Sequence, residues 1–159
     1  MNFVIVNVPE KKFIGKSLSM SFAEDMTRKL WSSFMPRVKE IENRVGGERI
    51  SMQLYSDDFM KNPALPFTKW ALVEVADFTL APDGLEKINI TGGLYGVFPY
   101  KGNVIQAPVF FEKIFKEIIP ASDYELDNSR PHFEILPEGY NPMDESSEEK
   151  IYVPLISKY

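Results

Sequence analysis

The chain has no cysteine and a single histidine among its 159 residues. The lack of cysteine excludes a disulfide framework, a thiol nucleophile and a cysteine zinc site. With His132 as its one imidazole, the chain is poorly supplied with ligands for a zinc site built from protein side chains. We therefore expect neither a bound metal nor a cofactor.

Positive charge is also scarce. The 18 lysines and arginines are outnumbered by 23 acidic residues, which gives a formal net charge of −5. Binding to nucleic acid is not expected, because duplex recognition needs a basic face that displaces counterions. The apolar run at positions 3–6 has no basic leader and is far too short for a signal peptide or a membrane span. We expect a cytoplasmic protein that does not enter a membrane.

An apolar fraction of 44% with 26% charged residues is ordinary for a globular chain, and the length suits one domain over residues 1–159. Two parts of that domain follow the same pattern. Residues 13–16 and 30–36 resemble residues 94–97 and 114–120, and a pair of strand-like runs follows each time, at 50–55 and 70–75, then at 132–136 and 151–156. The predicted fold is α+β, with repeats at 1–80 and 85–159 that each contain strand, helix, strand, strand. Two such units should pack about a pseudo-twofold axis, with a crevice between them that suits a ligand.

The first helix is predicted to begin at Ser21, which opens a capping box with Glu24. A stripe at helical spacing then continues to Val45, and Gly46-Gly47 should end the helix. Pro36 lies within the stripe and predicts a kink.

In the second helix, Pro108 suits the first turn and Pro120 follows the end. Residues 137–149 carry two prolines, a glycine and five acidic residues, which predicts a solvated loop.

Glu134 is the strongest candidate for chemistry. It lies in the predicted strand 132–136, where alternation places His132 and Glu134 on one face and Phe133 on the other. Alternation alone is equally compatible with a surface carboxylate. However, Gln53 occupies the matching position of the first repeat, so the two polar side chains should meet near the pseudo-axis.

Five aromatic residues fall in predicted strands: Tyr55, Trp70, Tyr95, Phe98 and Tyr152. Rings that face one cavity could hold a flat or cationic ligand by stacking and quadrupole attraction. About half of such rings are expected to be core residues instead. His132 could act as a general base, although a single histidine beside a proline is more often a packed or surface ring.

These features together resemble the GyrI-like small-molecule-binding domain, which also occurs as the effector-binding domain of AraC-type and multidrug-sensing MerR-type regulators. The similarity spans nearly the whole chain and rests on the order of four strings: Gly92-Gly93-Leu94-Tyr95-Gly96-Val97-Phe98, Lys101-Gly102, Tyr124-Glu125-Leu126 and Ile151-Tyr152-Val153-Pro154, with Ile119-Pro120 at the end of the second helix. The resemblance implies two helices on a curved antiparallel sheet of about eight strands. It also implies that Glu134 meets a cationic ligand and that Tyr152 lines the pocket. Lys150 departs from the family, which often has an acidic residue there.

The leading hypothesis is a small-molecule-binding protein that senses or sequesters amphipathic or cationic ligands with Glu134, Gln53 and the aromatic set. A second hypothesis is a hydrolase of strained small rings, with Glu134 as acid or base and Tyr95 or Tyr152 as its partner. A third is an interaction module whose acidic loop contacts a basic surface on a protein such as DNA gyrase.

Overall fold

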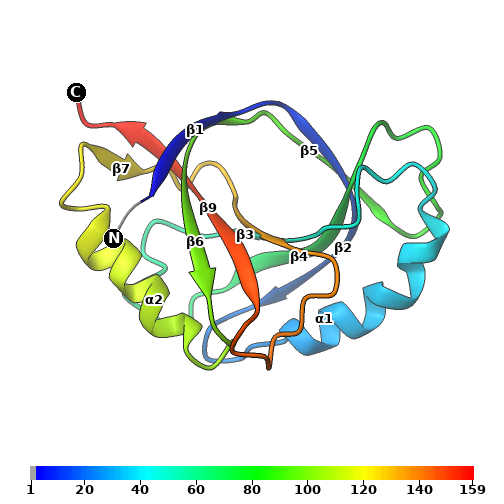
Figure 1. Ribbon diagram of the computed structural model, residues 1–159, viewed down its shortest axis with the longest axis horizontal. Coiled ribbons are helices and arrows are strands. Elements are labelled where there is room, and N and C mark those ends of the chain that lie inside the picture. The colour runs from blue at the N-terminus through cyan, green and yellow to red at the C-terminus, as the bar shows by residue number, and fades with distance from the viewer. Residues whose placement is uncertain (1–2) are drawn as a thin grey trace.

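The computed structural model describes residues 3–159 and has the α+β architecture that the sequence predicts (Figure 1). Two helical segments, α1 (Thr27–Phe34) and α2 (Ala107–Lys113), pack on a curved antiparallel sheet. The strands are β1 (Val4–Val8), β2 (Lys11–Met20), β3 (Arg49–Leu54), β4 (Phe67–Val75), β5 (Glu86–Ile90), β6 (Gly93–Lys101), β7 (Tyr124–Leu126), β8 (His132–Leu136) and β9 (Glu148–Ser157). Across these residues, no helix is long and apolar enough to span a membrane.

The strand order is symmetric between the two halves of the chain: each strand of the first half (β1–β4) has a counterpart of the second half at the same distance from the opposite end of the sheet. It is β1-β6-β9-β8-β3-β4-β2-β5, and β7 pairs with β9 outside this path. The centre of the sheet is the β3–β8 pair, in which Met52 lies opposite Phe133. At the two ends, β1 pairs with β6 and β5 pairs with β2, so each half supplies its first strand to the other half.

The two first strands meet at Gly92, between β5 and β6. Gly92 has φ +80°, and a Cβ there would collide with the backbone of Val8 and Pro9, the latter at 2.8 Å. Glycine is needed both for the left-handed conformation and for this close approach of two chains. Figure 1 shows β1 and β5 passing above the middle of the molecule, with α1 and α2 on its two flanks.

The first helix is shorter than the sequence predicts. The side chain of Ser21 does accept a hydrogen bond from the Glu24 backbone N–H at 3.0 Å, but this bond closes a turn, and the helix begins only at Thr27. The predicted end is wrong too, because the chain leaves the helical conformation after Glu40, ahead of Gly46. Residues at the two ends of the predicted stripe are exposed rather than packed, with Phe22 at 47% and Val45 at 48%.

Helical irregularities occur in both halves. The predicted kink at Pro36 is confirmed, since α1 passes directly into the 3-10 helix η1 (Met35–Glu40). In the second half, Pro108 lies in the first turn of α2 as predicted, and a single π-turn, η2 (Ile114–Ile118), extends the helix to just before Pro120. Such π-turns often occur beside functional sites.

The sheet has two apolar faces. On the helix face, α1 covers one core cluster that includes Leu30, Phe34 and Val73, and α2 covers another that includes Ile114 and Ile151. The opposite or inner face carries the third cluster, whose buried members are Val8, Phe13, Ile50, Met52, Leu72, Ile90, Tyr95 and Phe133. The clusters under α1 and α2 leave out the β3–β8 pair on the helix face. We call this strip, with the adjoining Lys69 of β4 and Glu149 of β9, the seam.

Candidate functional site

Glu134 lies in the middle of the seam. The β8 register places it opposite Ser51 of β3 on one side and Ile151 of β9 on the other. Since Ile151 belongs to the core cluster under α2, Glu134 also points to the helix face. Its residue exposure is only 9%, so this carboxyl group is buried rather than on the surface.

Gln53 meets Glu134 at the centre of the sheet, as the duplicated pattern predicts. The Gln53 side-chain amide donates to Glu134 Oε1 at 3.3 Å and to Ser51 Oγ at 2.9 Å. All three side chains are buried. One neutral amide provides little compensation for a buried negative charge.

The pKa of Glu134 is raised to about 8, mainly because burial disfavours the charged carboxylate and also because Glu149 repels it. The Lys69 ammonium and the Gln53 hydrogen bond act in the opposite direction. Lys69 lies beside Gln53 in the β3–β4 register, and its Nζ donates to Thr27 Oγ1 at 3.0 Å. Glu134 is therefore protonated at neutral pH unless a cation comes close.

Glu149 is a second carboxyl group at the seam, and sequence reasoning assigned it to a solvated loop. It belongs to β9, two residues from Ile151 and on the same face as Glu134. Burial raises the pKa of Glu149, and the Tyr140 hydroxyl donates to its Oε2 at 3.0 Å. The alternation of β9 is the signal that could have identified Glu149, had the strand been extended back beyond Ile151.

Aromatic rings close the other end of the seam. Tyr55 follows Gln53 by two residues and stacks on Phe59, with ring centroids 4.6 Å apart. The His132 ring lies edge-on to Tyr55 at 5.0 Å and to Phe115 of η2 at 5.7 Å. Burial lowers the pKa of His132 to about 3, and its Nε2 lies 2.7 Å from Asn128 Oδ1. An imidazole held neutral in this way is a packing element rather than a cation.

Three of the predicted ligand residues lie on the opposite side of the sheet from Glu134. Trp70 and Tyr152 share a cross-strand row on the inner face with Met52 and Phe133, and Tyr152 stacks on Phe133 at 4.6 Å. Tyr95 belongs to the same inner cluster and is 1% exposed. The sheet therefore separates these rings from Glu134, Gln53 and Tyr55.

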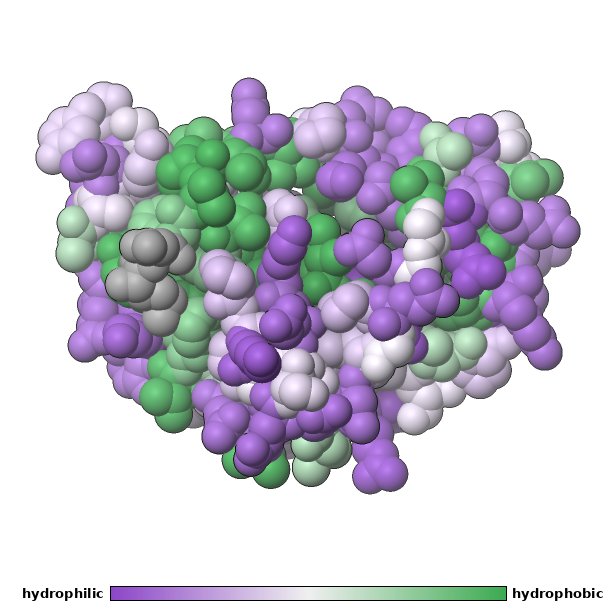
Figure 2. Space-filling view, viewed as in Figure 1, coloured by the Kyte–Doolittle hydropathy of each residue, from purple (hydrophilic) through white to green (hydrophobic). Residues whose placement is uncertain are grey.

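The inner face nevertheless offers apolar surface of its own. Its rim residues are only partly buried: Val6, Trp70, Ile88, Ile135 and Tyr152. The Trp70 Nε1 atom is buried without a hydrogen-bond acceptor. Figure 2 shows the surface hollowed near the centre of the face seen in Figure 1, with hydrophobic side chains at its edge. Phe98, the remaining predicted residue, is completely buried under α2 and packs edge-on against Phe3 at 4.6 Å.

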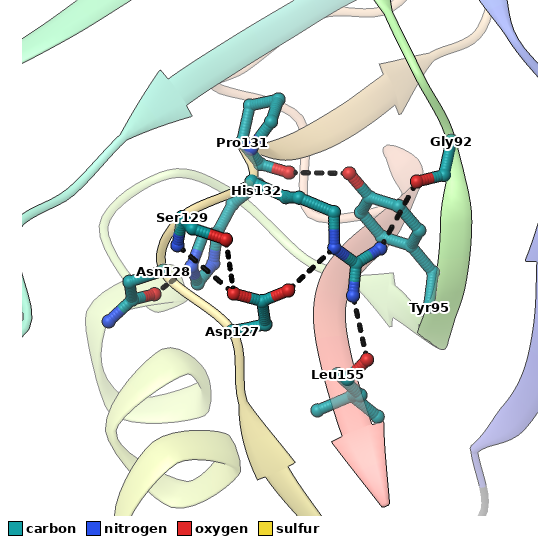
Figure 3. A network of polar contacts seen from close by, with 9 residues as sticks. Gly92, Tyr95, Asp127, Asn128, Ser129, Pro131, His132 and Leu155 are labelled. Carbon is teal, nitrogen blue, oxygen red and sulfur yellow. Dashed lines mark hydrogen bonds and ion pairs between the residues drawn. The ribbon is translucent and has the colours of Figure 1, made fainter.

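A network centred on Arg130 fixes the segment that leads into β8 (Figure 3). Its guanidinium donates to Asp127 Oδ2 at 2.8 Å and to the Leu155 carbonyl at 2.7 Å, with a longer bond of 3.4 Å to the Gly92 carbonyl. It also lies 5.0 Å from the centroid of the Tyr95 ring, whose hydroxyl donates to the Pro131 carbonyl at 2.8 Å. This network joins the β5–β6 turn, β9 and the start of β8, and so sets the position of the strand that carries Glu134.

Two surface cavities flank the segment that begins at Pro137. One, of about 320 Å³, is lined by η1, Arg49 and Glu138, and the other, of about 300 Å³, is lined by Ile135, Lys150 and Glu149. Neither contains Glu134. The second cavity is lined by Glu149, the other carboxyl group of the seam.

The fold is that of an α+β domain with two helices on a pseudo-symmetric antiparallel sheet, and solved structures share it. The structure of SAV2435 bound to tetraphenylphosphonium superposes with a TM-score of 0.77 at 14% identity, covering 98% of this chain and 94% of that one. The EcmrR C-terminal domain superposes with a TM-score of 0.75 at 13% identity, with 98% of both chains covered.

Sequence comparison then gives the family. Residues 1–156 match the GyrI-like small molecule binding domain, and the chain belongs to that family. The transcriptional regulator BrlR of Pseudomonas aeruginosa is 25% identical over 156 residues, which cover 98% of this chain and 56% of BrlR. The chain thus spans about half the length of this relative.

Proposed function

We propose that the chain binds amphipathic organic cations at the seam, with Glu134 as the anionic contact, and acts as a sensing or sequestering module. The observation that carries this proposal is the burial of Glu134 without a cationic partner. Among residues 3–159, no lysine, arginine or histidine nitrogen lies within 4.0 Å of its carboxylate. A carboxylate buried in this way is costly until a cation pairs with it.

The surroundings of Glu134 suit the apolar part of such a ligand. Tyr55, Phe59 and Phe115 offer ring faces and edges at one end of the seam, and aromatic faces attract cations as well as flat apolar groups. The fold shared with SAV2435, whose structure contains tetraphenylphosphonium, supports a lipophilic cation as the ligand. Similarity to BrlR, a transcriptional regulator, supports a sensing role.

Binding requires the seam to open. Phe59 lies between β3 and β4, and Tyr140 lies between β8 and β9, where its hydroxyl holds Glu149. A ligand reaches Glu134 when one of these two connections moves aside. We place ligand entry on the Glu149 side, because a cavity already reaches that residue.

Isothermal titration with tetraphenylphosphonium tests the proposal, with uncharged triphenylphosphine oxide as the comparison ligand. Glu134→Gln keeps the shape and removes the charge, and should weaken cation binding at least tenfold, or about 1.4 kcal/mol, without affecting the neutral ligand. Tyr152→Phe is the matched control on the inner face and should leave both ligands unaffected. Equal binding by wild type and Glu134→Gln, with a loss in Tyr152→Phe, would move the site to the inner face.

A second candidate is hydrolysis of strained small rings with Glu134 as general acid or base. Its favouring observation is the raised pKa of Glu134, about 8, which suits proton transfer near neutral pH. Tyr95 and Tyr152 are separated from it by the sheet, so Tyr55 takes the place of the tyrosine partner in this hypothesis. Incubation with cyclopropane- and epoxide-containing compounds, followed by mass spectrometry, should then show product with wild type and none with Glu134→Gln.

Binding to a protein such as DNA gyrase stays a prediction. It depends on the acidic loop, in which Asp144 and Glu145 are exposed.

A further inference from the structure

Two carboxyl groups and one ammonium group lie together at the seam, with Glu134 buried and Glu149 and Lys69 half-buried. Glu134 and Glu149 lie on the same face of neighbouring strands, and Lys69 reaches this patch from β4. Glu134 lies directly opposite Ile151 of β9, and Glu149 is two residues from Ile151. The two carboxyl-bearing residues are therefore diagonal neighbours, offset by about 7 Å along the strand direction. Two carboxylates this close, one of them buried, do not both ionise readily.

The other polar groups around Glu134 do not supply a compensating charge. Gln53, Ser51 and the buried hydroxyl of Tyr55 are neutral, and the pKa of Tyr55 is raised well above its usual value by burial and by Glu134. His132 on the same strand is neutral because its pKa is about 3. Arg49 lies on the same face of β3, but its guanidinium is directed to Met35 Sδ at 3.5 Å.

Lys69 and Tyr140 do not stabilise the ionised forms of the two carboxyl groups equally. Tyr140 donates a hydrogen bond to Glu149, which favours the ionised form of Glu149. Lys69 lowers the pKa of both groups but is itself held by Thr27. The Tyr140 hydrogen bond thus favours the negative charge on Glu149, and the proton stays on Glu134.

From this arrangement we propose that the seam exchanges one proton for each monovalent organic cation that it binds, with Glu134 as the group that releases the proton. The inference rests on the proposed function. In the empty protein, neutral Glu134 lies beside the Glu149 carboxylate and the Lys69 ammonium, so the patch has no net charge. When the cation arrives, the O–H bond of Glu134 breaks, the proton leaves to solvent, and the carboxylate pairs with the cation, so the patch stays neutral.

The exchange makes cation affinity depend on pH in a defined direction. Below the pKa of Glu134, each binding event must displace a proton, so affinity rises about tenfold for each pH unit. Above about pH 8, where Glu134 is already ionised, the affinity becomes constant. A neutral ligand displaces no proton and shows no such dependence.

Isothermal titration with tetraphenylphosphonium at pH 7, in two buffers of different ionisation enthalpy, measures the proton directly. The ligand carries a permanent charge and no exchangeable proton, so any proton released comes from the protein. About one proton per bound cation is expected from wild type, and a rise in affinity of roughly tenfold between pH 6 and pH 7. Glu134→Gln should release no proton and show a flat pH profile for any residual binding, whereas Lys69→Met should raise the pH at which affinity levels off.

The possible outcomes separate this inference from the proposed function. Tight binding by wild type with no proton release and a flat pH profile would overturn proton exchange while leaving the cation site in place. Proton release that persists in Glu134→Gln would assign the titrating group elsewhere and also overturn it. The absence of any binding between pH 6 and pH 9 would reject the proposed function itself.

Discussion

The crossing of β1 and β5 at Gly92 is the point where the fold should tolerate a single methyl group least. Gly92→Ala places a Cβ against the main chain of Val8 and Pro9, which cannot rotate away as a side chain can. It also forces a non-glycine residue to adopt φ +80°. The conformational part costs about 1 kcal/mol, and displacement of the packed backbone adds roughly 1–3 kcal/mol. We expect a total loss of about 3 kcal/mol in the free energy of unfolding.

Gly139→Ala is a matched control for the conformational part. Gly139 has φ +81°, nearly the same as Gly92, and nothing lies within 4 Å of the position its Cβ would take. This variant should lose only about 1 kcal/mol. The difference between the two variants, about 2 kcal/mol, then measures the steric contact at the crossing alone.

Urea unfolding followed by far-UV circular dichroism supplies both values, with the slope of the transition checked for two-state behaviour. Gly92→Ala should unfold at a clearly lower urea concentration than Gly139→Ala. Equal losses would refute the reasoning, because they would mean that β1 and the β5–β6 turn can separate at no cost.

Three further predictions concern charges. Arg130→Met should lower the free energy of unfolding by about 2–4 kcal/mol, because it leaves Asp127 and two carbonyl groups without their donor, and Arg130→Lys should recover part of this in the same urea assay. Between about pH 3 and 6.5 the unfolded chain protonates His132 and the folded chain does not, so wild-type stability should fall by up to about 1.4 kcal/mol for each unit that pH decreases, and His132→Asn should lack this slope. The pH dependence that Glu134 gives to stability has the opposite sign. The folded protein holds the Glu134 proton up to about pH 8, so the stability linked to that proton is present below about pH 4.5 and is lost as pH rises to about 8. Glu134→Gln should therefore raise the melting temperature relative to wild type more at pH 9 than at pH 5, and an equal shift at both values would contradict a buried titrating carboxyl group.

Much of the fold could be predicted because the duplicated pattern constrains it twice. The strand runs and the contact between Gln53 and Glu134 follow from period-two alternation and from matching positions in the two repeats. The kink follows from the proline at position 36 within a helical stripe. The first helix was overestimated because apolar residues at helical spacing also occur in irregular chain. Phe22 stacks on Tyr55 from outside the helix, although the spacing of the stripe includes it.

The composition of the site was harder to predict. Alternation shows which residues of one strand share a face. It does not show which residues of the neighbouring strand lie on that same face of the sheet. That depends on register, and register placed Tyr152 opposite Phe133 and not opposite Glu134. Composition predicts a solvated acidic loop at Glu149 and Tyr140, whereas the hydrogen bond between them depends on a tertiary contact that composition does not encode.

The exchange of first strands between the halves has a consequence for how the chain reaches its folded state. Neither half alone can complete its own sheet, because β1 finds its partner only in β6 and β5 only in β2. The β3–β8 pair likewise forms only when both halves are present. The two halves must therefore fold as one cooperative unit, through pairings between distant parts of the chain that are intrinsically slow to form. A fragment carrying one repeat would close the same sheet only with a second copy, each copy lending its first strand to the other.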